Sequence, residues 1–176
     1  MELEEIPMVT NDKYWLYEKN DIIYNKYKVI LSQEQKDEIT YKYLVENEGD
    51  GSHGLEKGKW MLYFNNENID EKWKLAKKLY NDDKLYGITS MKCSTNKKNE
   101  RANDENTKVI ILYCDDSYNK DYIMKIGKNL YKNFNYTNVF YYKLDSQTSI
   151  GTIATGSKKN HLYKFNYIQD IDECLL

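Results

Sequence analysis

In the stretch 58–64, large apolar side chains occupy every second position, and this alternation constrains the fold more than any other feature of the chain. It reads GKWMLYF. Successive side chains of a β-strand point to opposite faces of a sheet. One face of this stretch therefore carries large apolar side chains, namely Trp60, Leu62 and Phe64. The other face carries Lys59, Met61 and Tyr63. The pattern predicts a strand with an apolar face and a lysine on the opposite face.

Short apolar or alternating runs recur along the chain and predict further strands. They span residues 13–18, 22–31, 86–94, 108–114, 139–144, 149–154 and 161–165. Helical spacing predicts three helices, which begin near Ser32, Asn68 and Asn119. Ser32 and Gln35 have the spacing of a capping box. Hairpin-length connections favour an α+β fold, in which helices cover one face of a curved, mostly antiparallel β-sheet.

The chain has the organisation of one domain. Its 176 residues contain no internal repeat and no dividing linker, so we expect residues 1–176 to form a single domain. Spacing places the three tryptophans in the core, namely Trp15, Trp60 and Trp73. No apolar run approaches the length of a membrane span.

Charge and cysteine usage narrow the possible functions. A net charge of −2 excludes the global basic surface that binds nucleic acid non-specifically, so any anion site must be local. The three cysteines are odd in number and form no CxxC motif, which favours reduced thiols in a soluble, cytoplasmic protein. The sequence has no P-loop, no metal-ligand spacing and no paired carboxylates in an apolar context. We therefore expect neither an enzyme nor a bound metal or cofactor.

Two loops carry residues of potential function. Residues 47–58 form a long glycine-rich stretch, NEGDGSHGLEKG, and loops of this length in compact domains are often functional. Residues 155–160 read TGSKKN and interrupt an alternating pattern. Lys158 and Lys159 at this turn are typical either of a solvated loop or of a cationic clamp for an anionic ligand.

The order of several motifs resembles the eukaryotic translation initiation factor 4E family, the messenger-RNA cap-binding proteins. The resemblance extends from about Gly58 to Phe165 and rests on GKW, a helix with a tryptophan, IGKNLYKNF and TIATGSKKNHLYKF. It implies a curved antiparallel sheet with about three helices on its convex face and the cap on the concave face. The unusual composition, with a single arginine, is compatible with a viral or protist member.

The resemblance implies a set of basic residues for the cap triphosphate. Lys59 matches a basic residue that precedes the tryptophan of GKW, and Lys92 matches a phosphate-binding position on a later strand. Lys158 and Lys159 match the loop that closes over the phosphates and the first nucleotides. Lysine neutralises phosphate as a point charge.

The resemblance also implies a site for the methylated guanine, which is cationic and is held between aromatic faces. The positions of the family's stacking tryptophans fall near Tyr24 or Tyr27 and in the glycine-rich loop. Tyr113 matches an aromatic residue that touches the methyl group. We therefore expect a variant pocket with tyrosine, and His53 as a further candidate, as stacking faces. Either Glu48 or Asp50 would accept hydrogen bonds from the guanine.

The family's convex face implies a protein partner. It binds a helix of a scaffold initiation factor of the 4G type, and Tyr41 or Tyr43 falls near that place. These expectations describe a monomer that binds capped messenger RNA and is not associated with a membrane.

A second resemblance leaves an alternative open. GKWMLYF, KCST and YYKLDSQT are similar to the basophilic-leukaemia-expressed protein family, whose fold is similar to that of 4E and which is linked by name to phosphothreonine lyases. Lys59 and Lys92 suit a lyase, but Met61 stands where its general acid must be, and only His53 or His161 remains as a substitute. The alternative is thus a phosphate-recognising or protein-interaction domain without cap binding.

Overall fold

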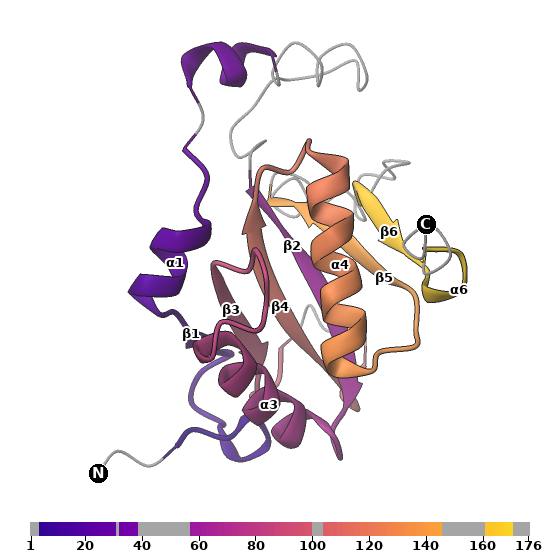
Figure 1. Ribbon diagram of the computed structural model, residues 1–176. Helices are drawn as coiled ribbons and strands as arrows, with labels where there is room; N and C mark the ends of the chain where they lie inside the picture. Colours follow the sequence, from indigo (N-terminus) through magenta and orange to yellow (C-terminus); the bar gives the residue numbers. More distant parts are fainter. Residues whose placement is uncertain (1–3, 31, 39–56, 100–103, 146–160, 171–176) are drawn as a thin grey trace.

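A computed structural model describes residues 4–30, 32–38, 57–99, 104–145 and 161–170 (Figure 1). Its six strands form one sheet in the order β1-β3-β4-β2-β5-β6, and every neighbouring pair is antiparallel. The strands are β1 (Trp15–Glu18), β2 (Lys57–Asn65), β3 (Ser90–Ser94), β4 (Thr107–Asp115), β5 (Phe140–Leu144) and β6 (Tyr163–Phe165). The predicted antiparallel α+β fold is therefore confirmed.

Helices α3 (Ile69–Asn81) and α4 (Lys120–Phe134) pack on the same face of the sheet (Figure 1). The apolar face of β2 points toward them, and Trp60 and Leu62 are completely buried there. The Trp60 indole Nε1 donates a hydrogen bond to the carbonyl oxygen of Ile123 in α4, at 3.3 Å. The core thus lies between these helices and the sheet, as the alternation in β2 predicts.

The remaining elements are short, and some of their side chains, such as Ile23 of α1, pack at the edge of this core. They are a 3-10 helix η1 (Pro7–Val9), α1 (Asp21–Tyr27), a helical segment at residues 33–38 and α6 (Tyr167–Asp170). The capping box predicted at Ser32 is confirmed, since Ser32 N donates to Gln35 Oε1 and Gln35 N donates to Ser32 Oγ. In the described part of the chain, no helix is both long and apolar enough to cross a membrane.

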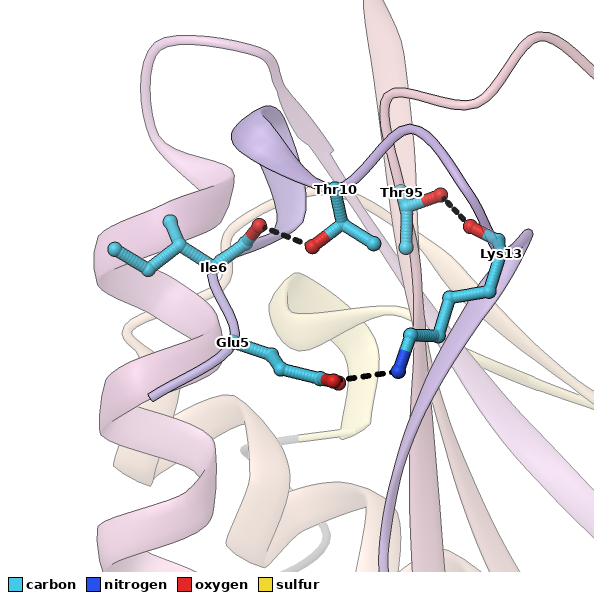
Figure 2. Close-up of polar contacts among 5 residues, drawn as sticks. All are labelled: Glu5, Ile6, Thr10, Lys13 and Thr95. Atoms are coloured by element: carbon cyan, nitrogen blue, oxygen red, sulfur yellow. Dashed lines mark hydrogen bonds and ion pairs between the residues drawn. The ribbon is translucent and has the colours of Figure 1, made fainter. Parts of the chain in front are cut away.

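The N-terminal segment is fastened to the sheet by side-chain contacts (Figure 2). Thr95, directly after β3, donates a hydrogen bond to the carbonyl oxygen of Lys13, and Lys13 Nζ lies 2.5 Å from Glu5 Oε1 (Figure 2). Thr10 Oγ1 donates to the carbonyl oxygen of Ile6. The Thr95 contact joins the N-terminal segment to the sheet just before β1, which pairs with β3, whereas the other two contacts order the segment itself.

The strand predicted at residues 22–31 is wrong, because residues 21–27 form helix α1. The Asn20 side chain caps this helix by accepting hydrogen bonds from the backbone N–H groups of Ile22 and Ile23. Asp21 in the first turn and Lys26 in the last turn also suit the helix dipole. The helix cap at Asn20 therefore outweighs the strand preference of the β-branched residues Ile22 and Ile23 that follow it.

Candidate functional site

The face of the sheet opposite α3 and α4, called here the lysine face, gathers several basic side chains. Lys59 lies on this face because its neighbour Trp60 points into the core and successive side chains of a strand point to opposite faces. Directly across from Lys59 are Tyr113 of β4 on one side and Lys143 of β5 on the other. Lys92 of β3 is paired with Ile111 and so is diagonal to Tyr113. We call Lys59, Lys92 and Lys143 the lysine cluster.

Gly58 allows β5 to come close enough to complete this cluster. A Cβ atom built on Gly58 would lie 2.6 Å from the carbonyl oxygen of Lys143 and 2.6 Å from the Tyr142 ring. A larger residue would therefore force β5 away from β2. The glycine of the GKW motif thus has a steric role that places Lys143 beside Lys59.

Tyr113 lies between the two lysines that the sequence predicted. The Lys59 Nζ is 5.9 Å from the centroid of the Tyr113 ring, and the Lys92 Nζ is 6.0 Å from it. The Lys92 Nζ also lies 4.0 Å from the centroid of the Trp15 ring, which is a favourable cation–π distance. Lys92 is therefore held between aromatic residues of β1 and β4.

The pKa values show that these charges influence one another. Burial, and then the neighbouring charge of Lys59, lowers the pKa of Lys92, while Asp145 partly opposes this effect. The pKa of Lys143 is lowered by the same two causes, burial and the charge of Lys59. Burial, followed by the nearby Asp145 carboxylate, raises the pKa of Tyr113 to about 12. The charged forms of Lys92 and Lys143 are thus destabilised by burial and by the positive charge of Lys59.

Asp145 supplies a negative charge next to the cluster. Its Oδ1 atom is 3.3 Å from the Nζ of Lys59. The Lys59 side chain is 8% exposed and that of Asp145 is 37% exposed, so the lysine is the more deeply buried partner. Neither Lys92 nor Lys143 has an ion pair with any residue in the described ranges. Among the residues that the structure describes, the lysine cluster thus combines three ammonium groups with a single ion-paired carboxylate, which is an excess of positive charge.

Such an arrangement can bind a ligand that carries several negative charges. Ammonium groups at a partly dehydrated surface interact with anions more strongly than they would in water. An anion that contacts two or three of these lysines would also relieve their mutual repulsion. Phosphate esters supply both the charge and the hydrogen-bond acceptors for this role.

The structure brings some of the predicted site residues together and separates others. Lys59, Lys92 and Tyr113 lie around one another as expected. The prediction missed Lys143, although the alternation of Phe140, Tyr142 and Leu144 as buried residues in β5 would have placed it on the lysine face. It also placed Trp15 in the core, which is wrong, because Trp15 lies beside Lys92 and is only half-buried.

Tyr24 and Tyr27, which were predicted to stack on the cap base, make their ring and hydroxyl contacts with residues other than the lysine cluster. Both belong to α1 rather than to a strand. The Tyr27 hydroxyl donates a hydrogen bond to Asp83 at 2.6 Å, and its ring makes an edge contact with Tyr86. The Nζ of Lys19 lies 4.0 Å from the centroid of the Tyr24 ring. Asp83 and Tyr86 lie in the chain after α3, and Lys19 lies directly after β1. None of the three belongs to a strand that carries a lysine of the cluster.

The other predicted residues lie outside the described residues. These are Tyr41, Tyr43, Glu48, Asp50, His53, Lys158 and Lys159. Among the residues that are described, no group of three or more His, Cys, Asp or Glu side chains could hold a metal ion.

Comparisons with known proteins add a family and several distant structural likenesses. Residues 8–151 match the family model described as basophilic leukemia-expressed protein Bles03. Among solved structures, the chain is similar to a schistosome eIF4E in complex with m7GpppA and 4E-BP, with 12% identity, 92% of this chain and 100% of that chain covered, and a TM-score of 0.48. It is also similar to C. elegans eIF4E-3 in complex with the 4E-binding protein Mextli, with 12% identity, coverage of 82% and 96%, and a TM-score of 0.44. Ascaris suum eIF4E-3 with m7G cap gives 12% identity, coverage of 81% and 92%, and a TM-score of 0.43. No curated protein sequence matches the chain.

Proposed function

The chain belongs to the basophilic leukemia-expressed protein Bles03 family, and for this member we propose a non-catalytic function in which the lysine face binds the N7-methylguanosine 5′ cap of messenger RNA in translation initiation. One observation carries the proposal: Lys59 and Lys92 approach the same tyrosine ring, with Lys143 directly across from Lys59. The triphosphate bridge of a cap supplies the dense negative charge that this cluster suits.

The aromatic side chains near the cluster support a ligand that carries a base. Trp15 and Tyr113 flank Lys92, and Tyr17 is paired with Lys92 across β1 and β3. Tyr17 is 71% exposed, so its ring is accessible to a ligand. A stacked base contributes about 1–3 kcal/mol on an aromatic face, and a methylated, cationic guanine adds cation–π attraction. In this proposal these residues replace Tyr24 and Tyr27 as candidates for the base.

We further propose that binding involves no bond cleavage. Met61 follows Lys59 by two positions on the same strand and has no proton that it can donate, which disfavours lyase chemistry. A phosphothreonine peptide incubated with the protein should therefore keep its mass. The proposal also includes a scaffold factor that binds at Tyr41 or Tyr43.

Fluorescence titration tests the function directly, because Trp15 lies beside Lys92. The intrinsic fluorescence should change on addition of N7-methyl-GTP, and GTP should bind more weakly. Lys92→Ala should weaken binding of both nucleotides. Lys97→Ala is a matched control, since the Lys97 Nζ lies 4.4 Å from the centroid of a different aromatic ring, that of Tyr14.

A second candidate function is recognition of phosphate groups without a preference for the cap. The position of Tyr27, hydrogen-bonded to Asp83, favours it, because a predicted stacking residue is engaged elsewhere. Equal affinity for N7-methyl-GTP and GTP, with both lost in Lys92→Ala, would support this candidate over cap binding.

A further inference from the structure

Asp145 already forms an ion pair with Lys59, whose ammonium group is the most buried of the lysine cluster. It follows the last residue of β5 and its carboxylate lies 3.3 Å from the Nζ of Lys59. Leu144, its neighbour, is paired with Gly58, the neighbour of Lys59. The pairing of β2 with β5 therefore fixes the backbone positions that bring this acid and this base together.

The two partners differ in their access to water. The Lys59 side chain is 8% exposed, whereas that of Asp145 is 37% exposed. A buried ammonium group needs an anionic partner, because burial without one carries a large desolvation penalty. A partly exposed carboxylate can exchange the same partner for water at much lower cost.

From this asymmetry we propose that Asp145 is an internal counter-ion, which an incoming phosphate group replaces on Lys59. The inference rests on the proposed function, because it concerns the same lysine face. It makes Asp145 a specificity-determining residue, which admits only anions that gain enough from Lys92 and Lys143 to displace it. A singly charged anion would lose this competition, whereas a pyrophosphate or triphosphate group would win it.

The surroundings of Asp145 are consistent with this competition. Its carboxylate lies 3.3 Å from the Nζ of Lys59, and its charge also acts on Lys92 and on Tyr113. A phosphate group on Lys59 would therefore be repelled by the carboxylate until Asp145 turned toward water. Removal of the negative charge should then improve the binding of every polyanion at this face.

Asp145→Asn tests the proposal in the full chain, with inorganic pyrophosphate as the ligand and isothermal titration calorimetry as the measurement. The amide keeps the shape of the side chain and removes its charge. We expect pyrophosphate to bind the variant about tenfold more tightly than the unchanged protein, in line with the loss of one competing charged hydrogen bond. Asp83→Asn is the matched control, because Asp83 forms an ion pair with Lys26 of α1. The affinity of this variant for pyrophosphate should equal that of the unchanged protein.

The other outcomes contradict the proposal. Weaker binding by Asp145→Asn would mean that the carboxylate holds Lys59 in place for the ligand or contacts the ligand itself. Unchanged binding would mean that the ion pair persists in the complex. If the variant unfolds because Lys59 lacks a partner, pyrophosphate should restore its folding, measured by circular dichroism, and a failure to restore it overturns the proposal.

The same experiment separates this inference from the proposed function. Pyrophosphate contains no base, so a lack of preference for N7-methyl-GTP leaves the result of Asp145→Asn intact. If pyrophosphate binds the unchanged protein and Asp145→Asn gives no gain, only the counter-ion role is lost. If pyrophosphate binds neither protein, both proposals fail.

Discussion

Gly127 of α4 lies directly against the indole ring of Trp60 of β2. A Cβ atom built on Gly127 would be 2.9 Å from the Cζ2 atom of Trp60 and 3.2 Å from the ring of Phe165. The glycine therefore allows the helix to approach the sheet. IGKNLYKNF and GKW, two of the motifs that resemble the 4E family, thus meet in the core, where they specify the packing of the fold rather than the chemistry of a ligand.

This contact predicts that Gly127→Ala destabilises the protein. Alanine in a helix interior is normally favoured over glycine by about 0.5–1 kcal/mol. Here the added methyl group would overlap a fully buried indole, and overpacking of this kind costs about 1–3 kcal/mol. We expect the free energy of unfolding in urea to fall. Lys132→Ala, at an exposed position of the same helix, should change it by less than about 0.5 kcal/mol. A more stable Gly127→Ala variant would show that α4 can move away from Trp60.

Lys92→Met separates ligand binding from stability. Methionine removes the charge, which should weaken the binding of pyrophosphate by about tenfold or more. The free energy of unfolding should change by less than about 1 kcal/mol, because relief of the repulsion from Lys59 offsets the lost contact with Trp15. Calorimetry and urea unfolding measure the two quantities. Lys97→Met removes a lysine from the face of another aromatic ring, Tyr14, and should leave the affinity unchanged. Equal affinity in Lys92→Met would exclude Lys92 from the site.

The lowered pKa values predict how affinity depends on pH. Only the protonated ammonium group attracts phosphate, and the pKa values of Lys92 and Lys143 lie below their usual value of 10.5. As the pH rises through these lowered values, the free protein loses protons that binding must restore, so affinity falls before ordinary lysines titrate. ATP is a suitable ligand, since phosphate monoesters ionise at about pH 6 and its chain charge is constant in alkaline solution. Calorimetry in buffers of different ionisation enthalpy should detect proton uptake on binding. Affinity that stays constant until ordinary lysines titrate, without proton uptake, would contradict the prediction.

Tyr27→Phe tests whether Tyr27, which was predicted to stack on the cap base, contributes to the site. The hydroxyl donates to Asp83, and its loss should lower the free energy of unfolding by about 0.5–1.5 kcal/mol. The affinity for N7-methyl-GTP should not change, because Tyr27 lies beside Tyr86 rather than the lysine cluster. Reduced affinity, measured by fluorescence titration at a temperature where the variant is folded, would show that Tyr27 contributes to binding of the cap base.

The elements that were predicted well carry strong local signals. The alternation in β2 and the helical spacing in α3 and α4 locate these elements to within a few residues. Helix α1 was missed because its apolar residues resemble a strand, whereas the deciding signal is the single cap residue Asn20. Residues that follow a clear period are predictable, and short elements fixed by one hydrogen-bonding side chain are not.

The candidate site was predictable only in part, because it depends on strand register. Lys59 and Lys92 were found from their matches to a known family, but Lys143 needed the knowledge that β5 lies beside β2. The spacing of the tryptophans predicts that Trp15 lies in the core, which is wrong. Its actual position beside Lys92 follows from the pairing of β1 with β3, which joins residues far apart in the sequence.

Chemical-shift mapping with pyrophosphate tests the central claim, that the lysine face is an anion-binding surface. In ¹H–¹⁵N spectra, the largest shifts should occur in residues 57–61, 90–94, 111–115 and 140–145, which surround Tyr113 on neighbouring strands. Addition of chloride at matched ionic strength should not reproduce them. Shifts confined to α3 and α4, or the absence of saturable shifts near Lys59, Lys92 and Lys143, would contradict the claim.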